Sequence, residues 1–244
     1  MAPGLEPLRG GLIVSCQALP DEPLHSSATM AQMAVAAWQG GAAGIRANSA
    51  VDIAAIRQVM PLPVIGIVKR DYPDSPVYIT PTFAEAREVV ESGAHILAVD
   101  ATQRPRPGGL SLADLVAQIR RHFAIPLMAD VSSVSEGIAA AQLGFDVVST
   151  TLVGYAGDHE PLGYEPDFAL IREMVEAVTG RYGTPVIAEG HIWEPVQARR
   201  CLELGAYAVV VGSAITRPQL ITERFVREMQ GKAGAGRPSE CREA

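Results

Sequence analysis

Residues Val64–Arg70 have the sequence VIGIVKR, a run of apolar residues that ends in two basic side chains. The run follows a Pro-Leu-Pro segment, and its composition is typical of a strand covered on both faces, as in a parallel sheet. Lys69 therefore lies at the end of a buried strand, where parallel α/β folds place their chemistry. An ion pair with a neighbouring loop would also account for this lysine.

The same pattern of a short apolar run followed by a polar residue recurs along the chain, and each run precedes a segment of helical composition. The expected strands are 11–15, 42–45, 64–68, 95–99, 126–129, 145–148, 185–188 and 207–211. The expected helices are 28–39, 51–60, 83–92, 112–122, 135–143, 168–179, 195–204 and 221–229. Eight alternating units predict a closed (β/α)8 TIM barrel of the α/β class, not an open doubly wound sheet. We expect one barrel domain over residues 1–230 and a flexible polar tail over 231–244.

The composition of the chain disfavours several classes of binding partner and location. The formal net charge of −7 disfavours nucleic acid and anionic membrane surfaces. No apolar run reaches the roughly 18 residues of a membrane span, and the N-terminus lacks a signal-peptide pattern. The three cysteines, Cys16, Cys201 and Cys241, show neither disulfide nor metal spacing, which favours a reducing cytoplasm.

Polar side chains follow the predicted strands at the end where the barrel opens. Because the eight strand ends of a barrel surround one opening, these side chains converge although the sequence separates them widely. They are Ser15, Gln17, Arg46, Lys69, Asp100, Asp130, Thr150, Glu189 and the pair Gly212-Ser213. A single polar strand end is easily an accident of packing, but eight in register indicate a site.

The last two strands end in residues suited to an anion. Gly190 follows the seventh strand, and Gly212 and Ser213 follow the eighth. The loops after these two strands form the usual phosphate site of phosphate-binding barrels, where glycine lets backbone N–H groups approach the anion. Arg217, four residues beyond Ser213, can add a bidentate contact. We therefore expect a phosphate-bearing substrate.

Lys69 and Glu189 are the candidates for proton transfer. Free lysine, with a pKa of about 10.4, is a poor base at neutral pH, so burial or a nearby cation such as Arg46 has to lower its pKa. Asp130 and Glu189 can orient the lysine or substrate hydroxyls. Two other interpretations use the same residues: a Schiff base on Lys69, as in barrel aldolases, and a sugar-phosphate-binding module without catalysis.

Ordered blocks along the chain resemble a known family. The blocks are Gly11–Gln17, Gly44–Ala47, Pro63–Arg70, Tyr78–Thr82, Ala98–Thr102, Met128–Asp130, Ser149–Tyr155, Ile187–Gly190 and Val210–Pro218. Together they are similar to the N-acylglucosamine-6-phosphate 2-epimerases, also called N-acetylmannosamine-6-phosphate 2-epimerases. The resemblance covers residues 10–227.

The resemblance implies a TIM barrel that interconverts N-acetylmannosamine 6-phosphate and N-acetylglucosamine 6-phosphate in sialic-acid breakdown, without metal or coenzyme, as a homo-oligomer such as a dimer. It assigns the proton acceptor and donor to Lys69 and its catalytic partner to Glu189. It assigns the substrate contacts to Gln17, Arg46, Asp130 and Arg217. One departure is His191, where the family pattern has Arg or Lys after Glu-Gly, and this affects the expected grip on the substrate.

Overall fold

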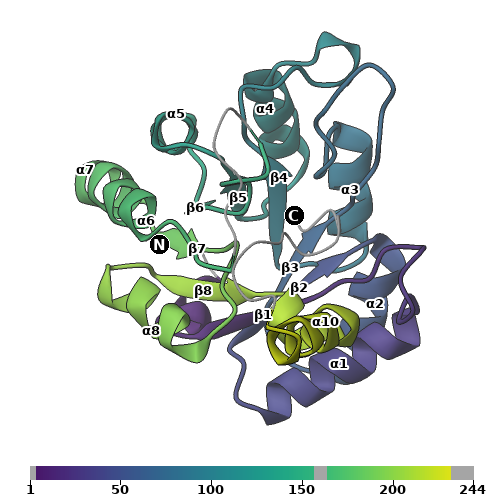
Figure 1. Ribbon diagram of the computed structural model, residues 1–244. Helices are drawn as coiled ribbons and strands as arrows, with labels where there is room; N and C mark the ends of the chain where they lie inside the picture. The colour runs from purple at the N-terminus through teal and green to yellow at the C-terminus, as the bar shows by residue number, and fades with distance from the viewer. Residues whose placement is uncertain (1–3, 157–163, 232–244) are drawn as a thin grey trace.

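The computed structural model describes residues 4–156 and 164–231. Eight parallel strands form a closed barrel in the order β1-β2-β3-β4-β5-β6-β7-β8, with helices around the outside (Figure 1). The strands are β1 Leu12–Cys16, β2 Gly44–Asn48, β3 Val64–Ile67, β4 Ile96–Asp100, β5 Leu127–Asp130, β6 Val147–Ser149, β7 Val186–Ala188 and β8 Ala208–Val211. The predicted single-domain (β/α)8 TIM barrel is confirmed. Of the expected polar tail, residues 232–244 lie outside the described residues.

The helices begin mostly where the sequence supplies a capping side chain. Hydroxyl groups of Ser49, Thr82 and Ser111 accept backbone N–H groups at the starts of three of them, which satisfies donors that a helix start leaves unpaired. The helices are α1 Ser27–Gln39, α2 Ala50–Val59, α3 Phe83–Glu91, α4 Leu112–His122, α5 Val134–Gln142, α6 Phe168–Met174, α7 Gly180–Tyr182, α8 Pro195–Glu203, α9 Ser213–Thr216 and α10 Pro218–Met229. Short 3-10 turns lie at Glu6–Leu8 and Pro107–Gly109.

Two apolar layers hold the barrel together. Inside it, side chains such as Ile13, Ile65, Ile96 and Met128 are fully buried. The second layer lies between the strands and the surrounding helices. Because aromatic residues are only 5% of the chain, aliphatic side chains fill both layers. Among the described residues, no helix is both long and apolar enough to cross a membrane.

The structure corrects three of the predicted elements. The second strand begins at Gly44 and ends at Asn48, so Arg46 lies in its middle and not after its end. Its charge does not end the strand, because the side chain is paired inside the barrel. The third strand ends at Ile67, two residues before Lys69. The helix predicted over 168–179 is α6 followed by a π-helical turn at Val175–Thr179 and the short α7.

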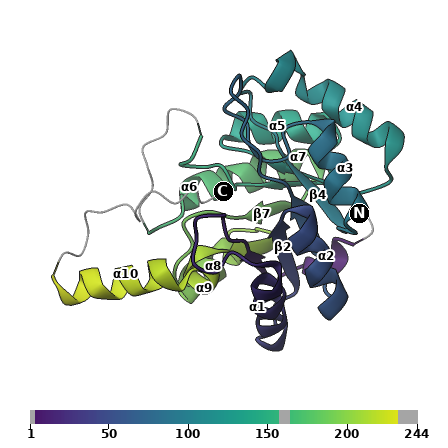
Figure 2. The ribbon, with the colours of Figure 1, turned by 90° about the vertical axis from the view of Figure 1, so that its right-hand side faces the viewer.

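The last helix departs from the barrel wall. α10 begins directly after α9 and extends away from the body of the molecule (Figure 2). Leu220 in its first turns is buried, whereas Phe225 and Met229 further along are 67% and 85% exposed. Its outer half therefore presents large apolar side chains to solvent.

Candidate active site

A cavity of about 570 Å³, including its open mouth, lies at the C-terminal ends of β1, β3, β6, β7 and β8. The lining residues include Ser15, Gln17, Lys69, Thr151, Tyr155, Glu189, Gly190, His191, Trp193, Gly212, Ser213, Thr216 and Arg217. The strand order of the barrel thus brings to one place residues that span two hundred positions of the chain.

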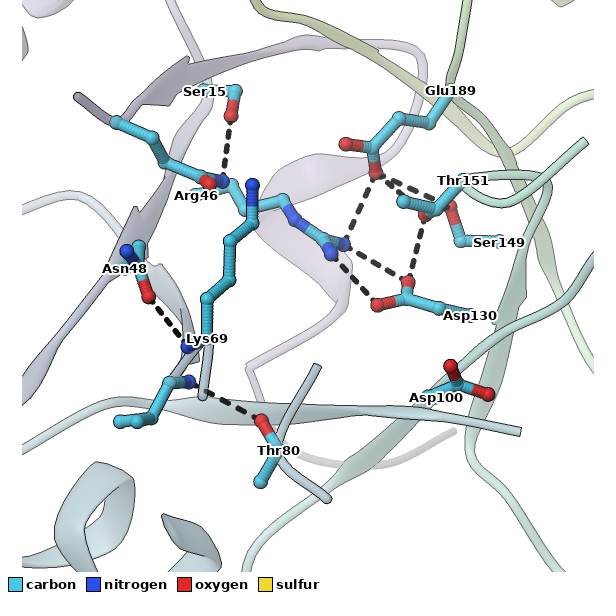
Figure 3. Close-up of polar contacts among 12 residues, drawn as sticks. Ser15, Arg46, Asn48, Lys69, Thr80, Asp100, Asp130, Ser149, Thr151 and Glu189 are labelled. Carbon is cyan, nitrogen blue, oxygen red and sulfur yellow. Dashed lines mark hydrogen bonds and ion pairs between the residues drawn. The ribbon is translucent and has the colours of Figure 1, made fainter. Parts of the chain in front are cut away.

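A charged network lies behind Glu189 (Figure 3). The fully buried guanidinium of Arg46 donates to both oxygens of Asp130, from Nη1 to Oδ1 at 3.0 Å and from Nη2 to Oδ2 at 2.7 Å. Its Nη1 also lies 3.1 Å from Oε2 of Glu189. Burial by itself lowers the pKa of Arg46, but Asp130 and Glu189 together raise it above its ordinary value. Arg46 is therefore a permanent buried cation.

The end of β6 fixes Glu189 from the other side. The hydroxyl of Thr150 donates to the Glu189 carbonyl at 2.8 Å and accepts the Glu189 N–H at 3.0 Å. The hydroxyl of Thr151 lies 2.9 Å from Glu189 Oε2 and 2.7 Å from Asp130 Oδ1. Burial raises the pKa of the Glu189 carboxyl above its ordinary value, although Arg46 opposes the shift. A carboxyl held in this way is suited to exchanging a proton within the cavity.

Lys69 is the amine of the site. Burial and the cations Arg217 and Arg46 lower its pKa to about 7, against the opposing effect of Glu189 and Glu22. Figure 3 shows its side chain extended, and Arg46 is one of the two cations that act on it. The two causes that the sequence predicted, burial and a neighbouring cation, thus act on this amine. A lysine with this pKa is about half neutral at pH 7 and can act as a base.

Arg217 does not stand alone at the other end of the cavity. Its Nε lies 2.8 Å from Oε1 of Glu22, and its Nη1 donates to Ser213 at 3.1 Å. Both charged side chains are buried, at 7% and 8% exposure. Glu22 comes from the loop after β1, so this loop fixes the direction of the guanidinium. Gln17 from the same loop donates to Ser15 at 2.9 Å.

The segment after Glu189 has an unusual backbone. Gly190 has φ +102° and His191 has φ +58°, a left-handed conformation that non-glycine residues seldom adopt. The His191 ring stacks on Tyr155 with centroids 4.7 Å apart and planes 15° apart. Strained backbone of this kind is often found at functional sites. The turn places His191 on the cavity wall.

Of the nine residues to which the sequence assigned a catalytic or substrate-binding role, seven line the cavity: Gln17, Lys69, Glu189, Gly190, Gly212, Ser213 and Arg217. Arg46 and Asp130 are fully buried and reach the cavity through Glu189. Thr151, Tyr155 and Glu22 were not predicted. Thr151 follows a strand end already recognised as polar, but no feature of the sequence pairs Glu22 with Arg217. In the part of the chain that is described, no cluster of His, Cys, Asp and Glu could hold a metal ion.

Comparison with known proteins agrees with this geometry. Residues 30–231 match the family described as "Putative N-acetylmannosamine-6-phosphate epimerase". The chain belongs to this family. Two curated relatives, both named "Putative N-acetylmannosamine-6-phosphate 2-epimerase", come from Enterobacter sp. (strain 638) and Shouchella clausii (strain KSM-K16). They are 54% and 53% identical over 228 residues, which cover 93% of this chain and 95% and 98% of the relatives.

A solved structure supports membership of the N-acetylmannosamine-6-phosphate epimerase family. The N-acetylmannosamine-6-phosphate 2-epimerase of Clostridium perfringens is 50% identical and superposes with a TM-score of 0.87, covering 92% of this chain and 95% of that one. Thiamine phosphate pyrophosphorylase of Pyrococcus furiosus, 18% identical with a TM-score of 0.58, covers 94% of this chain and 99% of its own. This second likeness shows the barrel fold alone.

Proposed function

We propose that this chain is an isomerase that interconverts N-acetylmannosamine 6-phosphate and N-acetylglucosamine 6-phosphate, in the breakdown of sialic acid and other amino sugars. The observation that carries the proposal is Lys69, an amine with a pKa of about 7 that faces one cavity with Glu189 and Arg217. The identity of the substrate is inferred from similarity to the family and to the Clostridium enzyme.

Inversion at C2 begins with removal of the C2 proton from the ring-opened sugar. The neutral amine of Lys69 takes this proton, and the electron pair of the C–H bond forms an enolate whose charge rests on O1. A proton returned to the opposite face of C2, by Lys69 after the intermediate turns or by Glu189 as a second proton carrier, gives the epimer. Lys69 and Glu189 both line the cavity, and the pKa of Lys69 is lowered while that of Glu189 is raised, so both are suited to moving a proton at C2.

The buried pair of Arg46 and Asp130 holds this machinery in place. Arg46 orients Glu189 and keeps a positive charge close to Lys69, which favours the neutral amine. Asp130 neutralises Arg46, since an unpaired buried guanidinium would be costly. We assign Gln17 to the substrate from its place on the cavity wall.

We assign the substrate phosphate to the end of the cavity formed by Gly190, Gly212, Ser213 and Arg217. Arg217 supplies the charge and the glycines leave room for close approach of the anion. Glu22 keeps the guanidinium aligned when the cavity is empty, so little conformational entropy is lost on binding.

The test is incubation of the purified chain with N-acetylmannosamine 6-phosphate in D2O, followed by NMR at C2. We expect formation of the epimer together with loss of the C2 proton signal. Borohydride added with substrate should leave Lys69 unmodified, because a trapped adduct would indicate a Schiff base instead. Binding without any interconversion would contradict the proposed activity and leave a binding module.

We also propose that the chain forms a homodimer in the cytoplasm. The exposed side chains of Phe225 and Met229 on α10 support association, since apolar groups of this size are usually covered in a partner interface. The buried free thiols of Cys16 and Cys201 suit a reducing compartment. Light scattering should give a mass twice that of the chain. The double variant Phe225→Glu, Met229→Glu should have the mass of a single chain.

A further inference from the structure

The backbone that carries Lys69 has left the barrel sheet. Pairing between β2 and β3 ends at Asn48 opposite Ile67, so the next two amides, of Val68 and Lys69, lie beyond the ladder. The Asn48 side chain accepts the Lys69 N–H at 2.8 Å, and the Thr80 hydroxyl accepts the Val68 N–H at 3.3 Å. Figure 3 shows these two side chains on either side of the Lys69 backbone.

The loop after β3 returns to the same place and adds backbone bonds. Thr80 donates its N–H to the Val68 carbonyl at 2.8 Å, and Arg70 donates to Tyr78 at 2.9 Å. Lys69 and Ile79 form an isolated antiparallel bridge. Ile79 in turn accepts the N–H of Asp100 at 3.1 Å, which ties the segment to β4.

Strain accompanies both contacts. Thr80 is fully buried with φ +44°, and Ser49, next to Asn48, has φ +77°. With His191 these are the only non-glycine residues with positive φ in the described chain, and all three lie in the segments between a strand and the next helix. Non-glycine residues in this conformation persist where the surrounding structure enforces them, typically at functional sites.

We infer that Asn48 and Thr80 are positioning residues that hold the backbone of Val68 and Lys69 and thereby aim the amine into the cavity. The inference rests on the proposed role of Lys69 as the base. A lysine side chain has four rotatable bonds, so its amine can be placed within a fraction of an ångström only if its backbone is fixed. Misplacement by about 1 Å lowers a rate by about 100-fold. The gain in rate from such anchoring can therefore offset the cost of the strained backbone.

The test compares variants that remove or keep each acceptor. Asn48→Ala and Thr80→Val delete it, and valine keeps the branched shape of threonine at φ +44°. Thr80→Ser keeps the hydroxyl. Ser75→Ala is the matched control, because Ser75 also accepts a backbone N–H in this loop, that of Val77 at 3.0 Å, but does not contact Val68 or Lys69.

We expect kcat to fall about 10–100-fold in both deleting variants with KM changed less than about twofold. Thr80→Ser and Ser75→Ala should remain near wild type. We expect kcat/KM of the wild type to rise near pH 7. This pH should move upward in the deleting variants, because a displaced amine loses part of the burial, and of the closeness to Arg217 and Arg46, that lower its pKa. A purely structural role would leave this pH unchanged.

Several outcomes would overturn the inference. They are wild-type kcat in both deleting variants, an equal loss in Ser75→Ala, or a lower kcat with an unshifted pH profile. If one deleting variant does not fold, as judged by circular dichroism, the other decides, and Thr80→Ser serves as its comparison. An inactive wild-type protein would instead contradict the proposed epimerase activity, so the two failures are distinct.

Discussion

At the scale of single residues, Lys69 is defined by what surrounds it more than by its own chemistry. Two arginines and two carboxylates act on one amine, and burial adds to the effect of the arginines. Each arginine is itself paired with an acid, Arg46 with Asp130 and Arg217 with Glu22. The site therefore keeps a lowered pKa on the lysine while leaving no arginine without a counter-ion.

The first prediction separates the roles of Lys69 and Glu189. Lys69→Ala should abolish both epimerisation and deuterium exchange at C2, a loss of about 10⁴-fold or more, because general acid–base groups typically contribute 10²–10⁴-fold. Glu189→Gln should lower kcat but retain slow exchange. Exchange is measured by NMR in D2O after circular dichroism confirms folding. Exchange lost in Glu189→Gln and retained in Lys69→Ala would give the role of base to Glu189.

The second prediction concerns the phosphate end of the cavity. Arg217→Ala should raise KM about 10–150-fold with a much smaller change in kcat, since a charged hydrogen bond contributes about 1.5–3 kcal/mol to ground and transition state alike. Arg120→Ala is the control, because Arg120 is ion-paired with Asp146, away from the cavity. Steady-state kinetics decide the matter. Equal activity of the wild type on the unphosphorylated sugar would show that the enzyme does not recognise the phosphate group.

At the scale of secondary-structure elements, the sequence predicted what depends on local pattern. Alternating apolar runs and helical segments are enough to place eight strands and, with them, the strand-end residues Lys69 and Glu189. Contacts between loops were beyond its reach. The acceptors at Asn48 and Thr80 depend on how the loop after β3 folds back, and no local pattern records that return. The end of the second strand was also predicted wrongly. A charged residue such as Arg46 was expected to end the strand, because its partner Asp130 lies 84 residues away and local sequence does not reveal the pairing.

The third prediction tests the packing of β3 against its helices. A Cβ on Gly66 would lie 2.6 Å from Val89, 2.8 Å from Ala94 and 2.9 Å from Ile53, all short or branched side chains that cannot move aside. Gly66→Ala should therefore lower the free energy of unfolding by about 1–3 kcal/mol. Gly137→Ala is the matched control, because its Cβ would meet the sulfur of Met174.

Methionine is flexible and can adjust to the added methyl group. Gly137 also lies within helix α5, where alanine has a higher helix propensity than glycine. Urea denaturation of both variants measures the difference. A loss in Gly137→Ala as large as that in Gly66→Ala would show that close approach to side chains does not decide the cost.

At the scale of the whole molecule, the barrel places its charged site at one end of an otherwise aliphatic interior. Residues such as Ile65 and Met128 fill the barrel below, and Arg46, Asp130 and Lys69 lie toward its C-terminal end. Burying an amine there favours its neutral form but costs stability whenever it carries a proton. If Lys69 is the base, as proposed, the activity of the site benefits from the burial of this lysine while the stability of the fold is reduced by it.

The last prediction follows from that opposition. The pKa of Lys69 is about 7 in the folded protein, and its ordinary value of 10.5 applies to the unfolded chain. Between these two pH values the unfolded chain therefore binds more protons than the folded protein. Stability of the wild type should then rise with pH across this window, and the destabilisation by Lys69 should be complete below pH 7. The full difference corresponds to about 5 kcal/mol, which water at the partly exposed side chain reduces. Lys69→Met should therefore be inactive yet more stable by about 1–3 kcal/mol at pH 6, with the gain shrinking steadily toward pH 10. Urea titrations of both proteins at pH 6, 7, 8 and 9 measure it, and a difference that stays constant over this range would contradict the lowered pKa.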